Sequence, residues 1–267
     1  MRVLRRRWRD DLRDLRRYLM AAYIDLRLAV TGKADRELPP LRLRDVGGGD
    51  FRQVGDDLVK VLAEHGLKST DRVLDIGCGV GRVAIPLTRY LSGGSYEGFD
   101  VVKSWVRWCR RHITSRHPSF RFTHASIYNS HYNRRGTPVE TFRFPYPDQS
   151  FDFAFATSLF THLSPAGAKN YLREAGRVLR PGGTLCATFF LTGTETFTAL
   201  DFKVVRDEHR LLDGDDPDAA VAFTEAWLDE QLSRNVWQEP SMIAGSWRAG
   251  ERAVMFQDLV VVKKRGA

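Results

Sequence analysis

The sequence predicts an α/β fold in which helices cover both faces of a mostly parallel sheet. One observation is a glycine-rich turn at residues 73–82, between an apolar segment and a helical one. Another is a series of short apolar segments at residues 96–100, 120–125, 151–156 and 184–191, spaced as strands joined by helices. The 267 residues, 43% of them hydrophobic, are enough for one such core with additions.

The glycine-rich turn has the features of a loop that binds a nucleotide cofactor. Residues 73–76 suit a short buried strand, and Gly77, Gly79 and Gly81 follow at alternate positions. Glycine has no β-carbon to keep a ligand at a distance, and it permits positive φ in the turn. The helix expected at residues 83–91 would point its N-terminal N–H groups at the bound ligand.

The spacing of these glycines separates two kinds of cofactor. A dinucleotide-binding loop reads Gly-x-Gly-x-x-Gly, whereas Arg82 occupies the place of the third glycine here. Asp75 lies two residues before the first glycine, where a carboxylate would repel a pyrophosphate but would hold an ammonium group, directly or through water. S-adenosylmethionine carries an ammonium and a sulfonium, so it suits this loop better than a nicotinamide dinucleotide does.

The segments that follow carry further signals. Asp100 ends the second expected strand, 19 residues after Gly81, and a carboxylate there can accept hydrogen bonds from both ribose hydroxyls. A turn rich in Pro and Asp at residues 144–150 leads into the fourth strand. A Pro-Gly-Gly turn at residues 181–183 separates a helix from the fifth strand.

Together these motifs resemble the class I S-adenosylmethionine-dependent methyltransferase family over about residues 71–191. The resemblance implies a three-layer, Rossmann-like sandwich with a seven-stranded, mostly parallel sheet, whose last strand is antiparallel and lies next to the fifth. It implies S-adenosylmethionine as the cofactor, and it puts Ser126 where the family commonly has an acidic residue near the adenine amino group. The implied cofactor-binding residues are Asp75, Gly77, Cys78, Gly79, Gly81, Arg82, Asp100, Val101, Ser126, Ile127, Thr157 and Ser158.

The C-terminal part leaves the common core. We expect strands six and seven at residues 236–240 and 253–262, and helical spacing at residues 220–228. The loops around them should lie on the side where acceptors enter such sheets, and their sequence should set specificity. The residues singled out in these loops are Trp237, Trp247 and Arg248.

Residues 1–46 form a separate basic extension and linker, and residues 47–267 form the methyltransferase domain. The first 44 residues hold 13 Lys or Arg and 6 Asp or Glu, so they carry +7 of the chain's net charge of +8. The nearly neutral remainder argues against nucleic acid as a partner, because such a site needs a basic face around it.

The basic extension is predicted to be a helix with one apolar stripe. Our first interpretation is that the stripe packs on the core or over its cleft. Its seven-residue spacing also fits the seam of a homodimer, and the arginines clustered at one end also fit an anionic membrane surface or an acidic partner. The stripe consists of Trp8, Leu12, Leu15, Leu19, Ala22, Leu26 and Ala29.

A hydroxyl nucleophile benefits from a base, and His has the unperturbed pKa that suits this role near neutrality. His162 is the first candidate, because it follows the fourth strand, where the family places acceptor-facing residues. The alternative is a structural His that packs beneath the cofactor or caps the helix beginning at Ser164 and Pro165. His131 and Tyr132, on the long loop before the fourth strand, could line the acceptor pocket. No residue pattern requires a metal.

Absent motifs narrow the acceptor. No Asn-Pro-Pro-Tyr or Asp-Pro-Pro-Tyr quartet follows the fourth strand, and no Pro-Cys nucleophile is present, so methylation of nucleobases or of protein glutamine is not expected. The sequence favours O-methylation of a small-molecule, glycan or lipid-linked hydroxyl. The alternatives are an N-methyltransferase of a small molecule, a non-catalytic module that binds S-adenosylmethionine and is anchored by its basic arm, and a nicotinamide-dependent oxidoreductase.

The cysteines and the absence of a long apolar run bear on location. Cys78, Cys109 and Cys186 show no metal-ligand spacing, and such scattered cysteines suggest a reducing compartment. No apolar run approaches the roughly 20 residues that span a bilayer, and the early arginines lack the apolar segment of a secretory signal. We therefore expect a cytoplasmic protein, with peripheral contact at the inner membrane surface as a further option.

Overall fold

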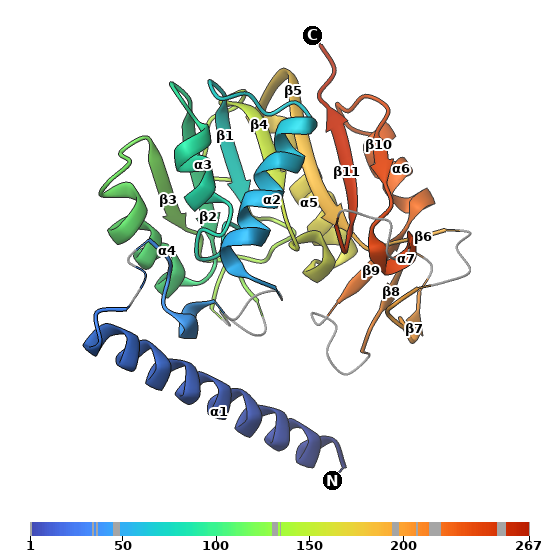
Figure 1. Cartoon of the computed structure of the whole chain (residues 1–267). Coiled ribbons are helices and arrows are strands. Elements are labelled where there is room, and N and C mark those ends of the chain that lie inside the picture. Colours follow the sequence, from blue (N-terminus) through green and yellow to red (C-terminus); the bar gives the residue numbers. More distant parts are fainter. Residues whose placement is uncertain are drawn as a thin grey trace.

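The computed structural model describes residues 2–33, 35, 37–44, 49–129, 133, 135–193, 198–206, 208–213, 220–249 and 255–266, with side chains from residue 15 onward. Figure 1 shows a body built around one twisted sheet, with a long N-terminal helix lying outside it. Within the described residues, no helix has an apolar stretch long enough to cross a membrane.

The main sheet has the predicted topology. In the described part of the chain it has seven strands in the order β10-β11-β5-β4-β1-β2-β3. The strands are β1 (Arg72–Ile76), β2 (Ser95–Asp100), β3 (Phe120–His124), β4 (Phe151–Ala156), β5 (Leu179–Phe189), β10 (Ser241–Ile243) and β11 (Asp258–Lys263). The strands from β1 to β5 pair in parallel, and β11 is antiparallel to both β5 and β10. This confirms the expected antiparallel strand beside the fifth one.

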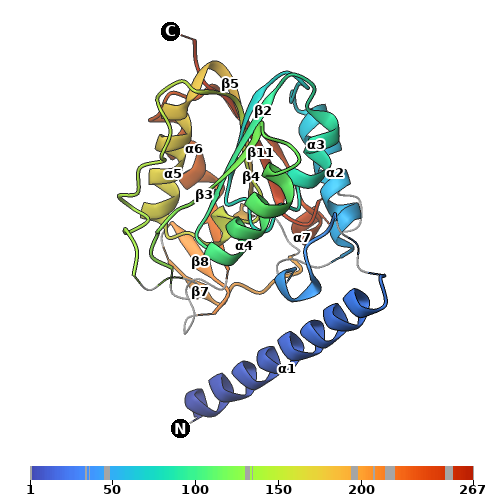
Figure 2. The same cartoon turned by 90° about the vertical axis from the view of Figure 1, so that its left-hand side faces the viewer.

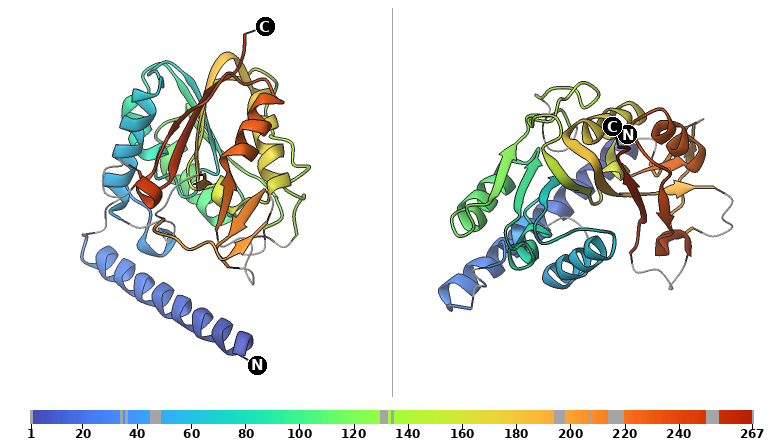
Figure 3. Two further views of the ribbon diagram at one scale, coloured as in Figure 1. Left: turned by 90° about the vertical axis from the view of Figure 1, so that its right-hand side faces the viewer. Right: turned by 90° about the horizontal axis from the view of Figure 1, so that it is seen from above.

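Helices cover both faces of the sheet, as the two views in Figure 3 show. The helices are α2 (Phe51–Glu64), α3 (Ala84–Tyr90) and α4 (Lys103–Cys109) on one face, and α5 (Pro165–Val178) and α6 (Glu225–Ser233) on the other. Alternate strand residues serve the two faces: Val73 packs with the first group, and Leu74 with the second. A π-helical turn, η2 (Arg110–Thr114), continues α4.

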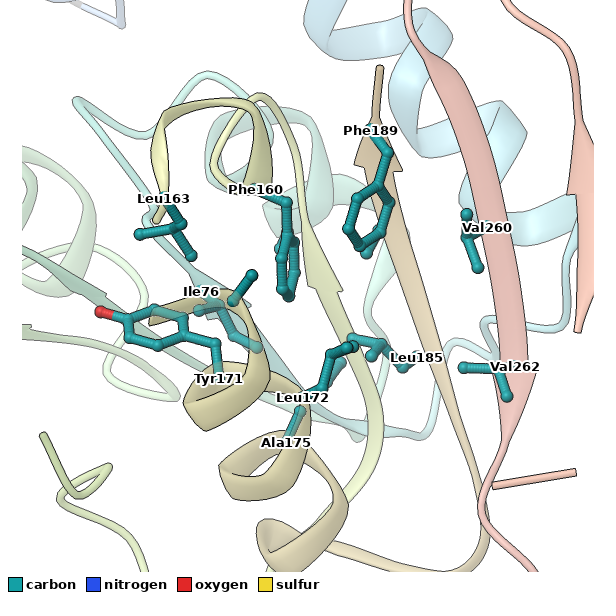
Figure 4. Packing of buried hydrophobic residues seen from close by; sticks show 14 of the residues in the cluster. Ile76, Phe160, Leu163, Tyr171, Leu172, Ala175, Leu185, Phe189, Val260 and Val262 are labelled. Atoms are coloured by element: carbon teal, nitrogen blue, oxygen red, sulfur yellow. The ribbon is translucent and has the colours of Figure 1, made fainter. Parts of the chain in front are cut away.

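The face under α5 is the most densely aromatic part of the core. Figure 4 shows Leu172 and Ala175 of α5 beneath Leu185 and Phe189 of β5. Phe160, in the short 3-10 helix η3 (Phe160–His162), stacks on Phe189 with ring centroids 4.5 Å apart. This packing fixes η3, and with it the loop that leaves β4.

Three boundaries predicted from sequence were wrong. Strand β10 begins at Ser241; within the predicted segment 236–240, Trp237 makes only an isolated antiparallel bridge to Lys264, and Pro240, which has no N–H to donate to a ladder, separates that bridge from β10. Strand β11 begins at Asp258 because the carbonyl groups of residues 255 and 256 accept hydrogen bonds from α7 (Ser246–Ala249) instead of β5. Strand β5 begins at Leu179, so the Pro-Gly-Gly turn is an irregularity inside the strand.

A second, small sheet lies at the end of β5 and was not predicted. Its strands are β6 (Leu191–Thr192), β7 (Val204–Val205), β8 (His209–Leu211) and β9 (Val221–Thr224), in the order β6-β9-β8-β7. Strand β9 occupies the first part of the segment read as helical, and α6 the rest. Thr224 joins them by accepting a hydrogen bond from the N–H of Trp227 as N-cap.

A buried carboxylate connects the two sheets. Asp258 is fully buried, and it accepts hydrogen bonds from the N–H groups of Leu191 (2.8 Å) and Gly245 (2.8 Å), from Trp247 Nε1 (2.7 Å) and from Arg248 Nε (2.7 Å). These four donors come from β6 and from the segment that includes α7. No sequence pattern indicates this network, because Leu191 lies far from the other members along the chain.

Replacing Asp258 with Ala is therefore expected to lower the free energy of unfolding by about 3 kcal/mol or more, since Arg248 loses one of its two carboxylates and the buried N–H groups of Leu191 and Gly245 lose their acceptor. Urea denaturation measures this change. The exposed Glu239→Ala should shift stability by no more than about 0.5 kcal/mol. Equal stability of the two variants would show that the network does not hold the sheets together.

The N-terminal helix α1 (Arg2–Val30) does not pack on the core as first expected. Among the described residues, its large apolar side chains are mostly exposed: the exposed fraction is 53% for Leu15, 58% for Leu19 and 63% for Leu26. Asp25 faces the body instead: it accepts a hydrogen bond from the N–H of Leu41 (2.6 Å) and pairs with Arg42 (3.0 Å). Since each residue turns a helix by about 100°, anchoring through Asp25 turns the stripe to the side: Ala22 and Ala29 lie next to the body, while Leu15 and Leu19 are left exposed.

Figures 1 and 2 both place α1 beyond the edge where the parallel strands end. The short 3-10 helix η1 (Leu41–Leu43) lies between α1 and the rest of the chain. The carboxyl edge of a parallel sheet is where ligands bind in α/β folds.

Candidate functional site

The glycine turn opens the carboxyl edge of β1. Gly79 has a φ of +54°, and a β-carbon built there would meet nothing within 4 Å. Gly81 has a φ of +82°, and its β-carbon would lie 2.9 Å from Ile113 Cδ1. Gly79 thus presents its backbone to open space, whereas Gly81 lets the turn pack on η2. This division supports a role for Gly79 in close approach to a ligand.

Asp100 closes the end of β2 and binds the same turn. Its carboxylate accepts hydrogen bonds from the N–H of Gly79 (2.9 Å) and of Val102 (2.8 Å). Burial raises the pKa of Asp100, although these backbone donors act in the opposite direction. The carboxylate therefore holds the glycine turn in place and stands beside the space that Gly79 leaves open.

Asp75 lies buried at the end of β1, 2% exposed, and accepts a hydrogen bond from the Tyr96 hydroxyl (2.6 Å). Burial raises the pKa of Asp75 to about 7, against the lowering effect of that hydrogen bond. A neighbouring cation favours the ionised form of such a carboxyl group. Asp75 is suited to an ammonium group for this reason.

Binding of S-adenosylhomocysteine, which has the same ammonium, should consequently depend on pH. As pH falls below about 7, Asp75 takes up a proton that the ligand must displace, so affinity should fall by up to tenfold per pH unit. Calorimetric titration between about pH 6 and 8 tests this. Asp75→Asn should bind weakly with a flat profile, and an unchanged slope in that variant would rule out Asp75 as the titrating group.

Two adjoining cavities lie over this edge among the described residues. The larger has a volume of about 690 Å³ and is reached by Asp75, and the smaller has about 180 Å³ and is reached by Asp100. Gly77 and His162 border both cavities. The larger cavity is walled on one side by α2, through Phe51, Val54, Leu58 and Val61.

The cavities bring together most of the residues that the resemblance implied. The larger cavity is lined by Asp75, Gly77, Cys78, Gly79, Arg82, Thr157, Ser158 and His162. The smaller cavity is lined by Gly77, Asp100, Val101, Ile127 and His162. Ser126 borders neither: it is exposed and accepts a long hydrogen bond from Asn133 Nδ2 (3.4 Å). His131 and Tyr132 lie outside the described residues.

His162 ends η3 and is exposed at the junction of the cavities. Ser164 caps α5 by accepting a hydrogen bond from the N–H of Gly167 (3.1 Å), with Pro165 at the first helical position, as predicted. The cap is made by Ser164, so His162 is not needed for it. Its position at the junction fits the acceptor-facing interpretation.

Two tryptophans expected near the acceptor lie elsewhere. Trp237 and Trp247 are fully buried, the first under α5 beside Gly176 and the second on the Asp258 network. Arg248 is held there as well, by Asp258 and Glu225. None of the three lines either cavity, so the expectation that they lie at the acceptor side was wrong: α5 covers Trp237, and the Asp258 network holds Trp247 and Arg248.

A polar group that the sequence did not reveal lines the larger cavity. Gln257 Oε1 accepts hydrogen bonds from Thr188 Oγ1 (2.6 Å) and Ser158 Oγ (3.2 Å), and Gln257 Nε2 donates to Thr161 Oγ1 (3.4 Å). Ser158 has a φ of +54°, which is uncommon for a residue with a side chain. Gln257 thus ties the loop after β4 to β5 and β11 beside His162.

The thiol of Cys78, in the glycine turn, is not suited to act as a nucleophile. Burial raises the pKa of Cys78 well above its ordinary value, so the thiol stays protonated. Among the described residues, no three His, Cys, Asp or Glu side chains gather in a way that could hold a metal ion.

Residues 73–183 match the family model described as a methyltransferase domain. With the strand order and the glycine turn described above, this part of the chain is a methyltransferase domain, and its fold is that of class I S-adenosylmethionine-dependent methyltransferases. The cofactor that this domain implies is S-adenosylmethionine.

The site fits this cofactor. Two buried carboxylates, Asp75 and Asp100, offer acceptors for the ammonium and the ribose hydroxyls, and the open space at Gly79 lies between their strands. The resemblance had implied this arrangement.

Two curated relatives are similar over part of their length. The chain is 34% identical over 167 residues to phthiotriol/phenolphthiotriol dimycocerosates methyltransferase 1 of Mycobacterium ulcerans, covering 61% of this chain and 53% of the relative. It is 31% identical over 129 residues to 27-O-demethylrifamycin SV methyltransferase of Amycolatopsis mediterranei, covering 47% and 40%. The chain spans about half the length of the first of these relatives and less of the second.

Solved structures share the fold. The [4+2]-cyclase SpnF superposes with a TM-score of 0.55 at 18% identity, covering 84% of this chain and 85% of the cyclase. A SAM-dependent methyltransferase of Methanosarcina mazei superposes with a TM-score of 0.51 at 20% identity, covering 78% and 98%. At such identities the likeness concerns the fold alone, and one fold can host different reactions.

Proposed function

We propose that the protein transfers a methyl group from S-adenosylmethionine to a hydroxyl of a small-molecule, glycan or lipid-linked acceptor. The observation that carries this proposal is the position of His162, which borders both the cavity of Asp100 and the larger cavity walled by α2. A base at that junction can reach the acceptor hydroxyl where it meets the cofactor.

The chain's own residues supply positioning and proton transfer. S-adenosylmethionine brings an activated methyl group, so holding the acceptor in line is the main requirement. Gln257 fixes the loop that carries His162, and His162 takes the hydroxyl proton. The aliphatic and aromatic wall of α2 favours an acceptor with a large apolar part.

The names of the relatives agree with this choice. One is named for a dimycocerosate acceptor and another for an O-demethylated rifamycin. An N-methyltransferase would use the same cofactor half and remains the second candidate. A non-catalytic module would bind the same cofactor but no acceptor. A nicotinamide-dependent oxidoreductase would bind a different cofactor.

An acceptor screen with radiolabelled S-adenosylmethionine tests the proposal. We expect label in amphiphilic or polycyclic compounds with free hydroxyls, and none when those hydroxyls are blocked. Label found in amines alone would favour the second candidate. Tight binding of S-adenosylhomocysteine with no turnover across the screen would favour a non-catalytic module.

The exposed helix α1 bears on location. Its exposed apolar residues in the described part are Leu15, Tyr18, Leu19, Met20, Tyr23, Ile24, Leu26 and Val30. They spread over a wider arc than the two positions per heptad of a coiled-coil seam. Such a face, on a helix with nine Arg and four Asp, suits the interface of an anionic bilayer better than a second copy. The proposed location is therefore cytoplasmic, at the inner membrane surface.

A further inference from the structure

A groove lies between α1 and the α4–η2 segment, apart from the two cavities of the site. It encloses about 980 Å³. One wall comes from the last turns of α1 and the segment that follows it, and the other comes from Trp108, Arg111, His112 and Arg116. Neither the family resemblance nor the proposed reaction uses this groove.

The groove is basic. Its lining includes Lys33, Arg42, Arg44, Arg111 and Arg116, against the carboxylates of Asp25 and Asp35. Both carboxylates are engaged already: Asp25 by Arg42 (3.0 Å), and Asp35 by Arg52 (2.9 Å), which lies outside the groove.

Arg111 of η2 and Arg116, two residues after the end of η2, line this space without a carboxylate partner among the described residues. In the described part of the chain, no Asp or Glu oxygen lies within 4.0 Å of Arg111 or Arg116. The pKa of His112 is lowered by burial and then by Arg116 and Arg111, which reports the positive field that they create. A mobile anion or an anionic ligand would be stabilised there.

The groove also has an apolar floor. Trp108 is nearly buried and stacks on His112 with ring centroids 4.7 Å apart, and Leu26, Leu28 and Leu38 add aliphatic surface. A ligand that fits both features has an anionic group attached to a hydrocarbon part.

The groove adjoins the larger cavity of the site. Leu43 and Arg44 line both, and the Arg44 guanidinium lies over the Phe51 ring at 5.5 Å from its centroid. Leu43 and Arg44 therefore separate a molecule bound in the groove from the α2 wall of the larger cavity. The exposed apolar face of α1 reaches the groove at Leu26, which is exposed and also lines the groove.

We propose that the groove between α1 and η2 binds the phosphate-bearing headgroup of an anionic membrane lipid while the exposed face of α1 enters the same bilayer. The inference rests on the membrane contact proposed above and assigns a specific headgroup site to it. Bound in this way, the protein holds the mouth of its acceptor cavity at the membrane, where an amphiphilic acceptor can enter it.

Vesicle sedimentation with the full chain tests the proposal. The protein should bind vesicles of phosphatidylcholine mixed with phosphatidylglycerol, and pure phosphatidylcholine vesicles much less. The double variant Arg111→Gln, Arg116→Gln should lose about fivefold in partitioning for each arginine removed. The matched variant Lys169→Gln, Lys263→Gln removes the same charge from exposed positions on α5 and β11 and should bind as the wild type does.

Several results would overturn the proposal. They are an absence of binding to the anionic vesicles, equal losses in the two double variants, and equal binding to neutral vesicles. Calorimetric binding of soluble glycerol phosphate without vesicle binding would make the groove a site for small anions. Sedimentation velocity showing a dimer that Leu19→Asp dissociates, in a protein that ignores vesicles, would make a second copy the occupant of α1.

The test is independent of the reaction. S-adenosylhomocysteine should bind the Arg111, Arg116 variant as it binds the wild type, because neither arginine borders the two cavities. Failure of vesicle binding with intact cofactor binding therefore counts against the headgroup site alone.

Discussion

Replacing Asp100 with Ala is expected to weaken the binding of S-adenosylhomocysteine by about 100-fold. A buried carboxylate that accepts hydrogen bonds from two ribose hydroxyls contributes about 1.5–3 kcal/mol for each bond to a charged group. The substitution also removes the acceptor for the Gly79 N–H, which positions the glycine turn. Calorimetric titration of the wild type and the variant measures the change.

Asp100→Asn is the informative companion, because it keeps the shape of the side chain and loses its charge. It should bind with an affinity between those of the wild type and Asp100→Ala. Substitution of the exposed Asp201 by Ala should leave affinity unchanged. If Asp100→Ala binds within twofold of the wild type while its melting temperature is also unchanged, the nucleoside half of the site lies elsewhere.

Replacing His162 with Ala is expected to lower kcat for a hydroxyl acceptor by about 100-fold or more, the usual contribution of a general base. Affinity for S-adenosylhomocysteine should stay within about twofold, since the carboxylates that hold the cofactor remain. Single-turnover methyl transfer separates these two quantities.

The control for this prediction is His65→Ala, which removes an imidazole from the C-terminal end of α2, away from both cavities. It should leave kcat unchanged. If His162→Ala alters cofactor affinity or melting temperature while kcat per bound cofactor is kept, His162 has the structural role that was the alternative from the beginning.

The sequence predicted the parts of the fold that are encoded locally. The strand from Arg72 to Ile76 and the turn at Gly77, Gly79 and Gly81 depend on neighbouring residues, and they appear where they were expected. The helix cap at Ser164 was also predicted from neighbouring residues, and the structure confirms it. Strand order followed from the family resemblance.

The elements that depend on distant partners were missed. The small sheet pairs segments between Leu191 and Thr224 that are each two to four residues long, too short to show an alternating pattern. Its carboxylate anchor, Asp258, lies inside the segment 253–262 predicted as a strand, and no neighbouring residue marks it as the acceptor of four distant donors. Helix α1 shows the same limit: periodicity predicted its stripe, but Asp25 decides which way the stripe faces.

The site divides in the same way. Asp75 and Asp100 were found because their place beside the glycine turn is visible in the sequence. Gln257 and the α2 wall come from segments outside the matched motifs, and only the fold brings them to the cavity. A glutamine just before a C-terminal strand has no sequence context that would mark it as part of a site.

Calorimetric titration of S-adenosylhomocysteine and of NADH into the wild-type protein tests the central claim most directly. The account predicts micromolar binding of S-adenosylhomocysteine, weakening as pH falls below about 7, with no measurable binding of NADH. Binding of NADH together with no heat from S-adenosylhomocysteine would contradict the assignment of Asp75, Asp100 and the glycine turn to a methyl donor.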